Sequence, residues 1–152
     1  QFTTVDASYF DDALFLGDSH TDGFHDYAGL GNATYFTKNG LTVKDAVEKS
    51  FIELDGKKVT LAEALGTRQF GKVYILLGIN EIGAYTAADW AAQYKSLLDL
   101  VREKQPDAVI FIQSIFHTTQ KKSDSSYFKN EVINERNAAI AQLTDGKTIL
   151  LF

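Results

Sequence analysis

Four short apolar runs, separated by segments with helical periodicity, constrain the fold of this 152-residue chain more than any other feature. The runs cover 13–16, 73–77, 108–112 and 148–152, and each has the length and composition of a strand buried on both faces. A shorter run at 35–37 indicates a fifth strand. Strands that alternate with helices require right-handed crossovers, which build a parallel sheet with helices on both faces. The sequence therefore predicts an α/β fold, a three-layer α/β/α sandwich with a doubly wound parallel sheet.

The segments between these runs carry helix signals. The clearest is 86–105, where apolar residues recur at helical spacing, Thr86 and Asp89 resemble a capping box and Pro106 ends the segment. We expect further helices over 42–50, 61–65 and 127–143. We also expect a small hairpin within 51–60 that turns at Asp55-Gly56.

Composition excludes several classes of protein. A chain of this length with 45% hydrophobic residues can bury one core, so we expect a single domain over 1–152. The net charge of -5 argues against a nucleic-acid partner, and the apolar runs are too short for a transmembrane segment. Without cysteine there is no disulfide or thiolate metal cluster, and the three histidines have no paired spacing, so we expect no metal site. Compartment and oligomeric state stay open.

Ligands of doubly wound sheets bind beyond the carboxyl ends of the strands, so the residues that follow each apolar run matter most. Gly-Asp-Ser-His follows the first run, and its serine is Ser19. A serine hydroxyl becomes a nucleophile when it is exposed beside a base and faces donors that stabilise an oxyanion. Ser19 stands behind a glycine that permits a sharp exit from the strand and before a segment expected to begin a helix. Taken alone, such a tripeptide is also typical of an ordinary turn or helix cap.

Three blocks of the sequence, in order, resemble those of the GDSL or SGNH hydrolases. They are Leu14-Phe15-Leu16-Gly17-Asp18-Ser19, Asn39-Gly40-Leu41-Thr42 and Leu77-Gly78-Ile79-Asn80-Glu81. The resemblance implies a flavodoxin-like SGNH fold in which Ser19 attacks an acyl carbonyl. The amides of Ser19 and Gly40 and the side chain of Asn80 would hold the oxyanion. It also implies a carboxylic ester substrate, on a carbohydrate or a lipid, and no cofactor.

The same family takes its general base from a late Asp-x-x-His block beyond the last strand. The sequence ends at Phe152, inside the last predicted strand, so we expect the domain to be incomplete at its C-terminus. Asp22-Gly23-Phe24-His25 has the spacing, but it stands directly after the nucleophile block and is not that late block.

Three further residues are expected at the same edge of the sheet. We expect His20, Glu81 and His117 to contact substrate, although Glu81 stands where the family most often has aspartate and could instead order its loop. His117 is also the better candidate for a base within this sequence. A non-catalytic SGNH-fold binding or scaffolding module is the alternative function. A flavodoxin-like nucleotide-binding domain is a weaker one, because no glycine-rich phosphate loop follows the first strand.

Overall fold

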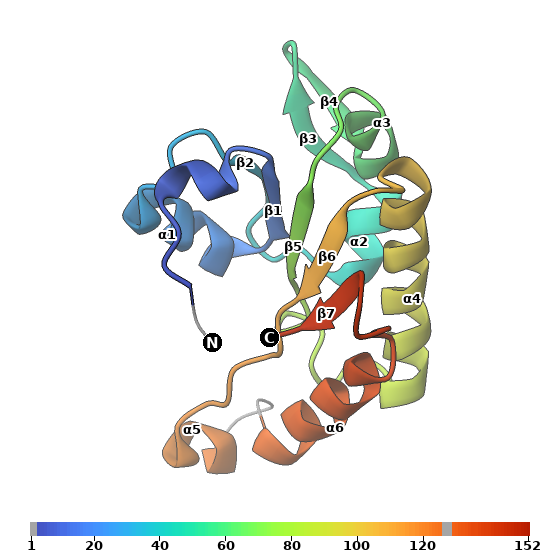
Figure 1. Ribbon diagram of the computed structural model, residues 1–152. Coiled ribbons are helices and arrows are strands. Elements are labelled where there is room, and N and C mark those ends of the chain that lie inside the picture. Colours follow the sequence, from blue (N-terminus) through green and yellow to red (C-terminus); the bar gives the residue numbers. More distant parts are fainter. Residues whose placement is uncertain (1–2, 126–128) are drawn as a thin grey trace.

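The structure, a computed structural model that describes residues 3–125 and 129–152, is built on a five-stranded parallel sheet (Figure 1). Neighbouring strands follow the order β2-β1-β5-β6-β7. These strands are β1 (Ala13–Gly17), β2 (Thr34–Thr37), β5 (Lys72–Leu76), β6 (Val109–Ile112) and β7 (Ile149–Leu151). The strands predicted from the apolar runs are confirmed, including the short one at 35–37.

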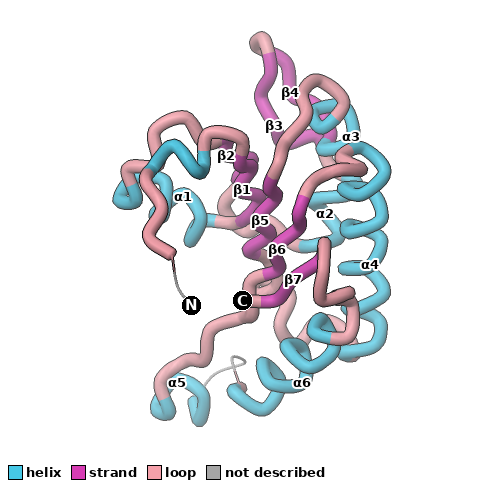
Figure 2. Tube along the Cα trace, in the orientation of Figure 1, coloured by secondary structure: helices cyan, strands magenta, loops and turns pink. Residues whose placement is uncertain are grey.

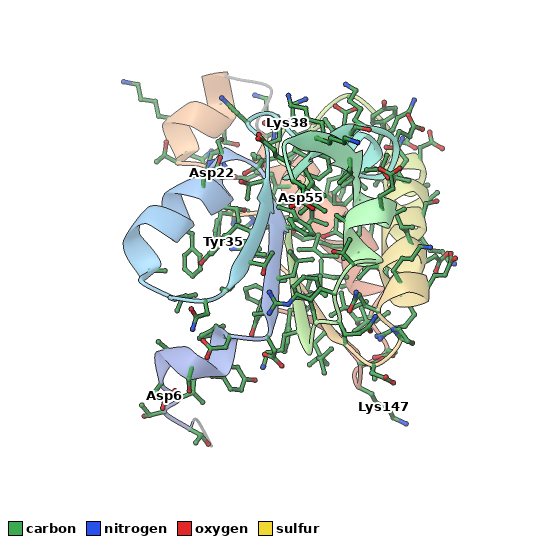
Figure 3. The ribbon with its side chains drawn as sticks, turned by 90° about the horizontal axis from the view of Figure 1, so that it is seen from above. Asp6, Asp22, Tyr35, Lys38, Asp55 and Lys147 are labelled. Atoms are coloured by element: carbon green, nitrogen blue, oxygen red, sulfur yellow. The ribbon has the colours of Figure 1, made fainter. Side chains whose placement is uncertain are left out.

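The winding of the sheet reverses between β1 and β5. The chain passes from β1 outward to β2, returns beyond β1 to β5, and then continues in one direction to β6 and β7. Every pairing is parallel, so all carboxyl ends lie at one edge. Figure 3 shows Asp22 and Lys38 near this edge, with Asp6 and Lys147 at the opposite one. Because ligands of open α/β sheets bind where the winding reverses, the segments that follow β1 and β5 define the expected site.

Helices cover both faces of the sheet, and the three-layer sandwich is thereby confirmed (Figures 1 and 2). On one face, α1 (Ser19–Ala28) contacts β1 and β2. The helices that pack against one another on the other face are α2 (Val43–Glu48), α3 (Leu61–Leu65), α4 (Ala87–Lys104) and α6 (Asn130–Ala141). A 3₁₀ helix, Ala7–Phe10, precedes β1.

The predicted hairpin is confirmed as β3 (Ser50–Leu54) and β4 (Lys57–Thr60), which pair antiparallel beside the main sheet. Its two turn residues, Asp55 and Gly56, both have positive φ angles, of 50° and 76°. That conformation is typical of the two-residue turn that matches the twist of a hairpin. The helix α3 follows directly, and Thr60 and Glu63 form a reciprocal capping box at its start.

One predicted helix differs from the structure. The expected helix over 127–143 is α6, which begins later, at Asn130, and 126–128 lie outside the described residues. Before it stands α5 (Gln120–Ser125), a short helix of polar residues. Its sequence has no apolar stripe, so periodicity gives no sign of it.

The described residues also bear on membranes and metals. No helix among them is long and apolar enough to cross a bilayer. No group of three or more histidine, cysteine, aspartate or glutamate side chains among them could hold a metal ion.

Candidate active site

Ser19 lies at the carboxyl end of β1, where it is the first residue of α1, and its side chain is exposed. Gly17 makes this position possible. A Cβ at Gly17 would overlap Thr21 Oγ1 and stand 2.9 Å from the backbone oxygen of Leu76. A larger residue would therefore push α1 away from β5. The close approach holds Ser19 at the edge where the winding reverses.

Asp18 connects the serine to its neighbours through a buried carboxylate that is 2% exposed. Its Oδ1 accepts hydrogen bonds from the backbone N–H of His20, at 2.9 Å, and from His20 Nδ1, at 3.0 Å. Its Oδ2 accepts one from Asn80 Nδ2, at 3.0 Å. A carboxylate oxygen accepts, so Nδ1 of His20 is the donor in this contact. Asp18 thus orients His20 and holds Asn80 beside the serine segment.

Asn80 links the serine segment to the segment that carries Gly40. Its Nδ2 also donates to the backbone oxygen of Leu41, at 3.1 Å, and Leu41 directly follows Gly40. The carboxamide of Asn80, in the connection after β5, therefore links the connections that follow β1 and β2. The structure brings together the three segments that hold Ser19, Gly40 and Asn80, although they are far apart in the sequence.

The backbone N–H groups of Ser19 and Gly40 lie at this edge and make no hydrogen bond within residues 3–125 and 129–152. The N–H of Ser19 is free because the first residues of a helix have no carbonyl one turn before them. Gly40 has a φ of 72°, a left-handed conformation that glycine adopts without strain. Both groups are available to a ligand.

A cavity of about 440 Å³ opens at this edge, within the usual size range of small-molecule sites. Asp18, His20 and Asn80 line it, whereas Ser19 and Gly40 are not among its lining residues. Its apolar lining comes mainly from the ends of β5 and β6 and the loops that follow. The side chains that line it include Leu76, Leu77, Ile79, Ile115, Phe116, His20, Asn80, Ser114 and His117. Phe116 is 73% exposed, so its ring presents a bare apolar surface at the opening.

His20 and His117 both line this cavity. His20 is paired with the Asp18 carboxylate. His117 instead has its Nε2 at 2.5 Å from the Oδ1 of Asn134 on α6, so its partner is a carboxamide. A carboxamide oxygen orients an imidazole but stabilises its cation less than a carboxylate does. This geometry favours a role for His117 in contacting substrate over a role as base.

The position of Glu81 requires a correction. We expected it to contact substrate, but its side chain is 3% exposed and does not line the cavity. Its Oε1 instead accepts hydrogen bonds from the backbone N–H of Val43, at 2.9 Å, and from Trp90 Nε1, at 3.0 Å. Burial raises the pKa of Glu81, and these two hydrogen bonds act in the opposite direction. The alternative expectation, that Glu81 orders its loop, agrees with this geometry.

Sequence reasoning overlooked the residues behind the site. Trp90 is fully buried in the core, and its indole N–H needs an acceptor there. Arg136, 2% exposed, lies over the ring of Trp90 with its guanidinium carbon 5.2 Å from the ring centre. One signal in the sequence could have revealed this cluster. A buried Trp90 needs an acceptor for its indole N–H, and Glu81, in the loop after β5, is an acidic residue that could provide it.

Solved structures with the same fold were found at low sequence identity. A Streptococcus pneumonia protein described as a candidate platelet activating factor is 18% identical, with a TM-score of 0.67, and the match covers 95% of this chain and 71% of that one. A family 3 carbohydrate esterase from Talaromyces cellulolyticus is 18% identical, with a TM-score of 0.60 and coverage of 91% and 77%. A family two carbohydrate esterase from Clostridium thermocellum is 15% identical, with a TM-score of 0.60 and 91% of this chain covered. The chain spans 52% of the length of that last protein.

Sequence comparison assigns the chain to a family, which structural likeness at such low sequence identity does not do. No protein of curated function shows significant sequence similarity to the chain. The sequence profile of the GDSL-like Lipase/Acylhydrolase family, however, matches residues 15–152. The match begins inside β1 and the first sequence block, and it includes the other two blocks and the other four strands of the main sheet. This chain belongs to the GDSL-like lipase/acylhydrolase family.

Proposed function

We propose that this protein is a serine esterase that cleaves carboxylic esters through an acyl-enzyme on Ser19. The observation that carries the proposal is the bridge made by Asn80. Its side-chain amide reaches the segment of Ser19 through Asp18 and the segment of Gly40 through Leu41. The N–H groups of Ser19 and Gly40 and the carboxamide of Asn80 thus lie on linked segments at the same edge as the exposed Ser19 hydroxyl. Acyl transfer needs a nucleophile and oxyanion donors of these kinds.

In the proposed reaction, Ser19 Oγ bonds to the acyl carbon while its proton passes to a histidine. The carbonyl oxygen becomes an oxyanion that accepts from the N–H groups of Ser19 and Gly40 and from Asn80 Nδ2. Since Nδ2 already donates to Leu41, the oxyanion replaces that carbonyl as acceptor. The tetrahedral intermediate expels the alcohol, which takes the proton from the histidine. Water then attacks the acyl-enzyme by the same route and releases the acid.

The proton acceptor in this scheme is the late histidine that the family resemblance implies. His20 lines the cavity as a substrate contact held in place by Asp18. Replacement of His20 by alanine separates these roles. A substrate contact changes kcat/KM by about 10-fold or less, whereas loss of the base lowers kcat by about 10⁴-fold or more.

The lining of the cavity supports a substrate with a small acyl group and a larger alcohol part. Aliphatic side chains, Leu76, Leu77 and Ile79 among them, provide an apolar surface for the acyl group. Phe116 at the opening provides a flat surface on which a sugar ring or an acyl chain could pack. The carbohydrate esterases among the structural neighbours favour an acetylated carbohydrate over a lipid ester as the first substrate to try.

The test combines turnover with covalent labelling. The intact protein is incubated with p-nitrophenyl acetate and, separately, with a fluorophosphonate probe, and the labelled peptide is identified by mass spectrometry. We expect turnover and a label on Ser19, with both lost in Ser19→Ala. Ser114→Ala is the matched control, because Ser114 lines the same cavity and is expected to keep the label. Absence of turnover and label in the wild-type protein would instead favour a binding or scaffolding module.

A further inference from the structure

We propose that Glu81 is a positioning residue that sets the separation between Gly40 and Asn80, the two donors on either side of the oxyanion site. The inference rests on the proposed function, since it concerns the same site. It goes beyond the ordering of the loop that carries Glu81, because it also includes the segment of Gly40. Glu81 would act on catalysis through the backbone and never touch the substrate.

The contacts of one carboxylate oxygen carry this inference. Oε1 of Glu81 accepts from the backbone N–H of Val43, at 2.9 Å, and from the indole N–H of Trp90, at 3.0 Å. Val43 is the first residue of α2 and stands three residues after Gly40, whereas Glu81 itself directly follows Asn80. The same oxygen therefore ties the Gly40 segment and the Asn80 loop to a single point on α4.

The Trp90 side chain, which is this point on α4, is held firmly in place. Trp90 is fully buried and Glu81 is 3% exposed, so neither side chain can move without disturbing the core. On its outer side the indole is covered by the guanidinium of Arg136, which donates a hydrogen bond to the backbone oxygen of Tyr85. Tyr85 precedes the start of α4 in the same connection as Glu81. The indole is thus held by α6 on one side and anchors the carboxylate on the other.

Stability alone does not account for a carboxylate at this position. The second oxygen of Glu81, Oε2, is buried and has no hydrogen-bond partner among the described residues. Burial of a charge with incomplete pairing costs more than burial of an apolar side chain of the same volume. A carboxylate oxygen that accepts from donors on two different elements fixes the positions of those elements relative to each other. An apolar side chain cannot do this.

The length of the side chain matters for the same reason. Aspartate, which the family most often carries here, is shorter by one methylene group, or by about 1.5 Å of reach. The glutamate reaches both the α2 amide and the indole from this loop. An oxyanion hole works when its donors stand about 2.7–3.1 Å from the developing charge, and an error of about 1 Å in such a site can cost about 100-fold in rate.

The experiment compares Glu81→Ala, Glu81→Gln and Glu81→Asp in the intact protein, with Glu53→Ala as control. Glu53 is an exposed glutamate on β3, away from the site. In Glu81→Ala we expect kcat for p-nitrophenyl acetate to fall by about 100-fold while KM stays within about twofold. Glu81→Gln keeps an acceptor oxygen, so we expect it to recover kcat to within about 10-fold of wild type. Glu81→Asp is expected to lie between the two.

Nuclear magnetic resonance gives a second readout that does not need activity. Trp90 is the single tryptophan of the sequence, so its indole N–H gives one resonance. We expect that resonance and the amide resonances of Gly40 and Val43 to shift in Glu81→Ala, and to stay unchanged in Glu53→Ala. If Glu81→Ala does not fold, the same comparison is made with Glu81→Gln and Glu81→Asp.

Two results would overturn the inference. One is a kcat for the Glu81 variants that equals wild type, and the other is a Gly40 amide resonance that does not respond to any of them. If the wild-type protein hydrolyses no ester, the proposed function fails, and the resonances still decide whether Glu81 holds the two segments together.

Discussion

Replacement of Gly78 by alanine tests the close packing that places the loop of Asn80. Gly78 has a φ of 123°, and a Cβ built on it would lie 2.6 Å from Cζ2 of Trp90 and 2.9 Å from Cδ1 of Ile115. Trp90 is fully buried and Ile115 is 8% exposed, so neither can move aside freely. The alanine methyl group therefore meets two obstacles, an unfavourable backbone conformation and an occupied volume.

The two costs can be separated by a matched control. Gly83 lies in the same connection with a φ of 88°, but a Cβ there would meet no atom within 4 Å. Gly83→Ala therefore carries the backbone cost alone, about 1–2 kcal/mol. Gly78→Ala adds a cost of overpacking of about 1–3 kcal/mol, which gives a total of about 2–5 kcal/mol.

Urea denaturation of both variants, followed by circular dichroism, measures the difference in the free energy of unfolding. For a chain of this size, an extra 1–3 kcal/mol corresponds to a further fall in Tm of about 2–12 °C. The reasoning is refuted if Gly78→Ala is no less stable than Gly83→Ala. In that case the indole does not pack against the backbone of the Asn80 loop.

Three further predictions concern the oxyanion site, the core and pH. Asn80→Ala should lower kcat by about 10²–10³-fold, while a fluorophosphonate should still label Ser19. A variant that loses the label because it unfolds would contradict this prediction. Gln105 is fully buried and bonds to the backbone N–H of Phe70 and the backbone oxygens of Leu65 and Arg68, so Gln105→Leu should cost at least about 1–3 kcal/mol in the free energy of unfolding measured with urea. Because burial raises the pKa of Glu81 from 4.5, the folded state holds this proton to higher pH than the unfolded state. Stability should fall as the pH rises from 4.5 through the raised pKa, and Glu81→Gln should flatten that fall in urea titrations across this range.

The fold could be predicted from the sequence because its strands and helices carry strong, separate signals. The strands are apolar runs of the right length, and α4 combines a cap at Thr86, an apolar stripe and Pro106. No helix was predicted at α5, because its residues, 120–125, are polar and form no apolar stripe. Its helical state depends on its surroundings, which periodicity does not describe.

The candidate site was predictable where residue type and place along the sheet agree. Ser19 and Asn80 each follow a buried strand, so the topology brings them to one edge. Glu81 could not be placed, since an acidic residue in a loop normally faces solvent. Its burial depends on a donor from α4 and another from α2, and neither partner is near it in the sequence.

A crystal structure of the intact protein after reaction with a fluorophosphonate tests the central claim most directly. We predict phosphorus bonded to Ser19 Oγ, with one phosphoryl oxygen about 2.7–3.1 Å from the backbone nitrogens of Ser19 and Gly40 and from Nδ2 of Asn80. The Asn80 amide should have left the carbonyl of Leu41 to make that bond. A phosphoryl group on another residue, or an oxygen that points away from these three nitrogens, would contradict the account.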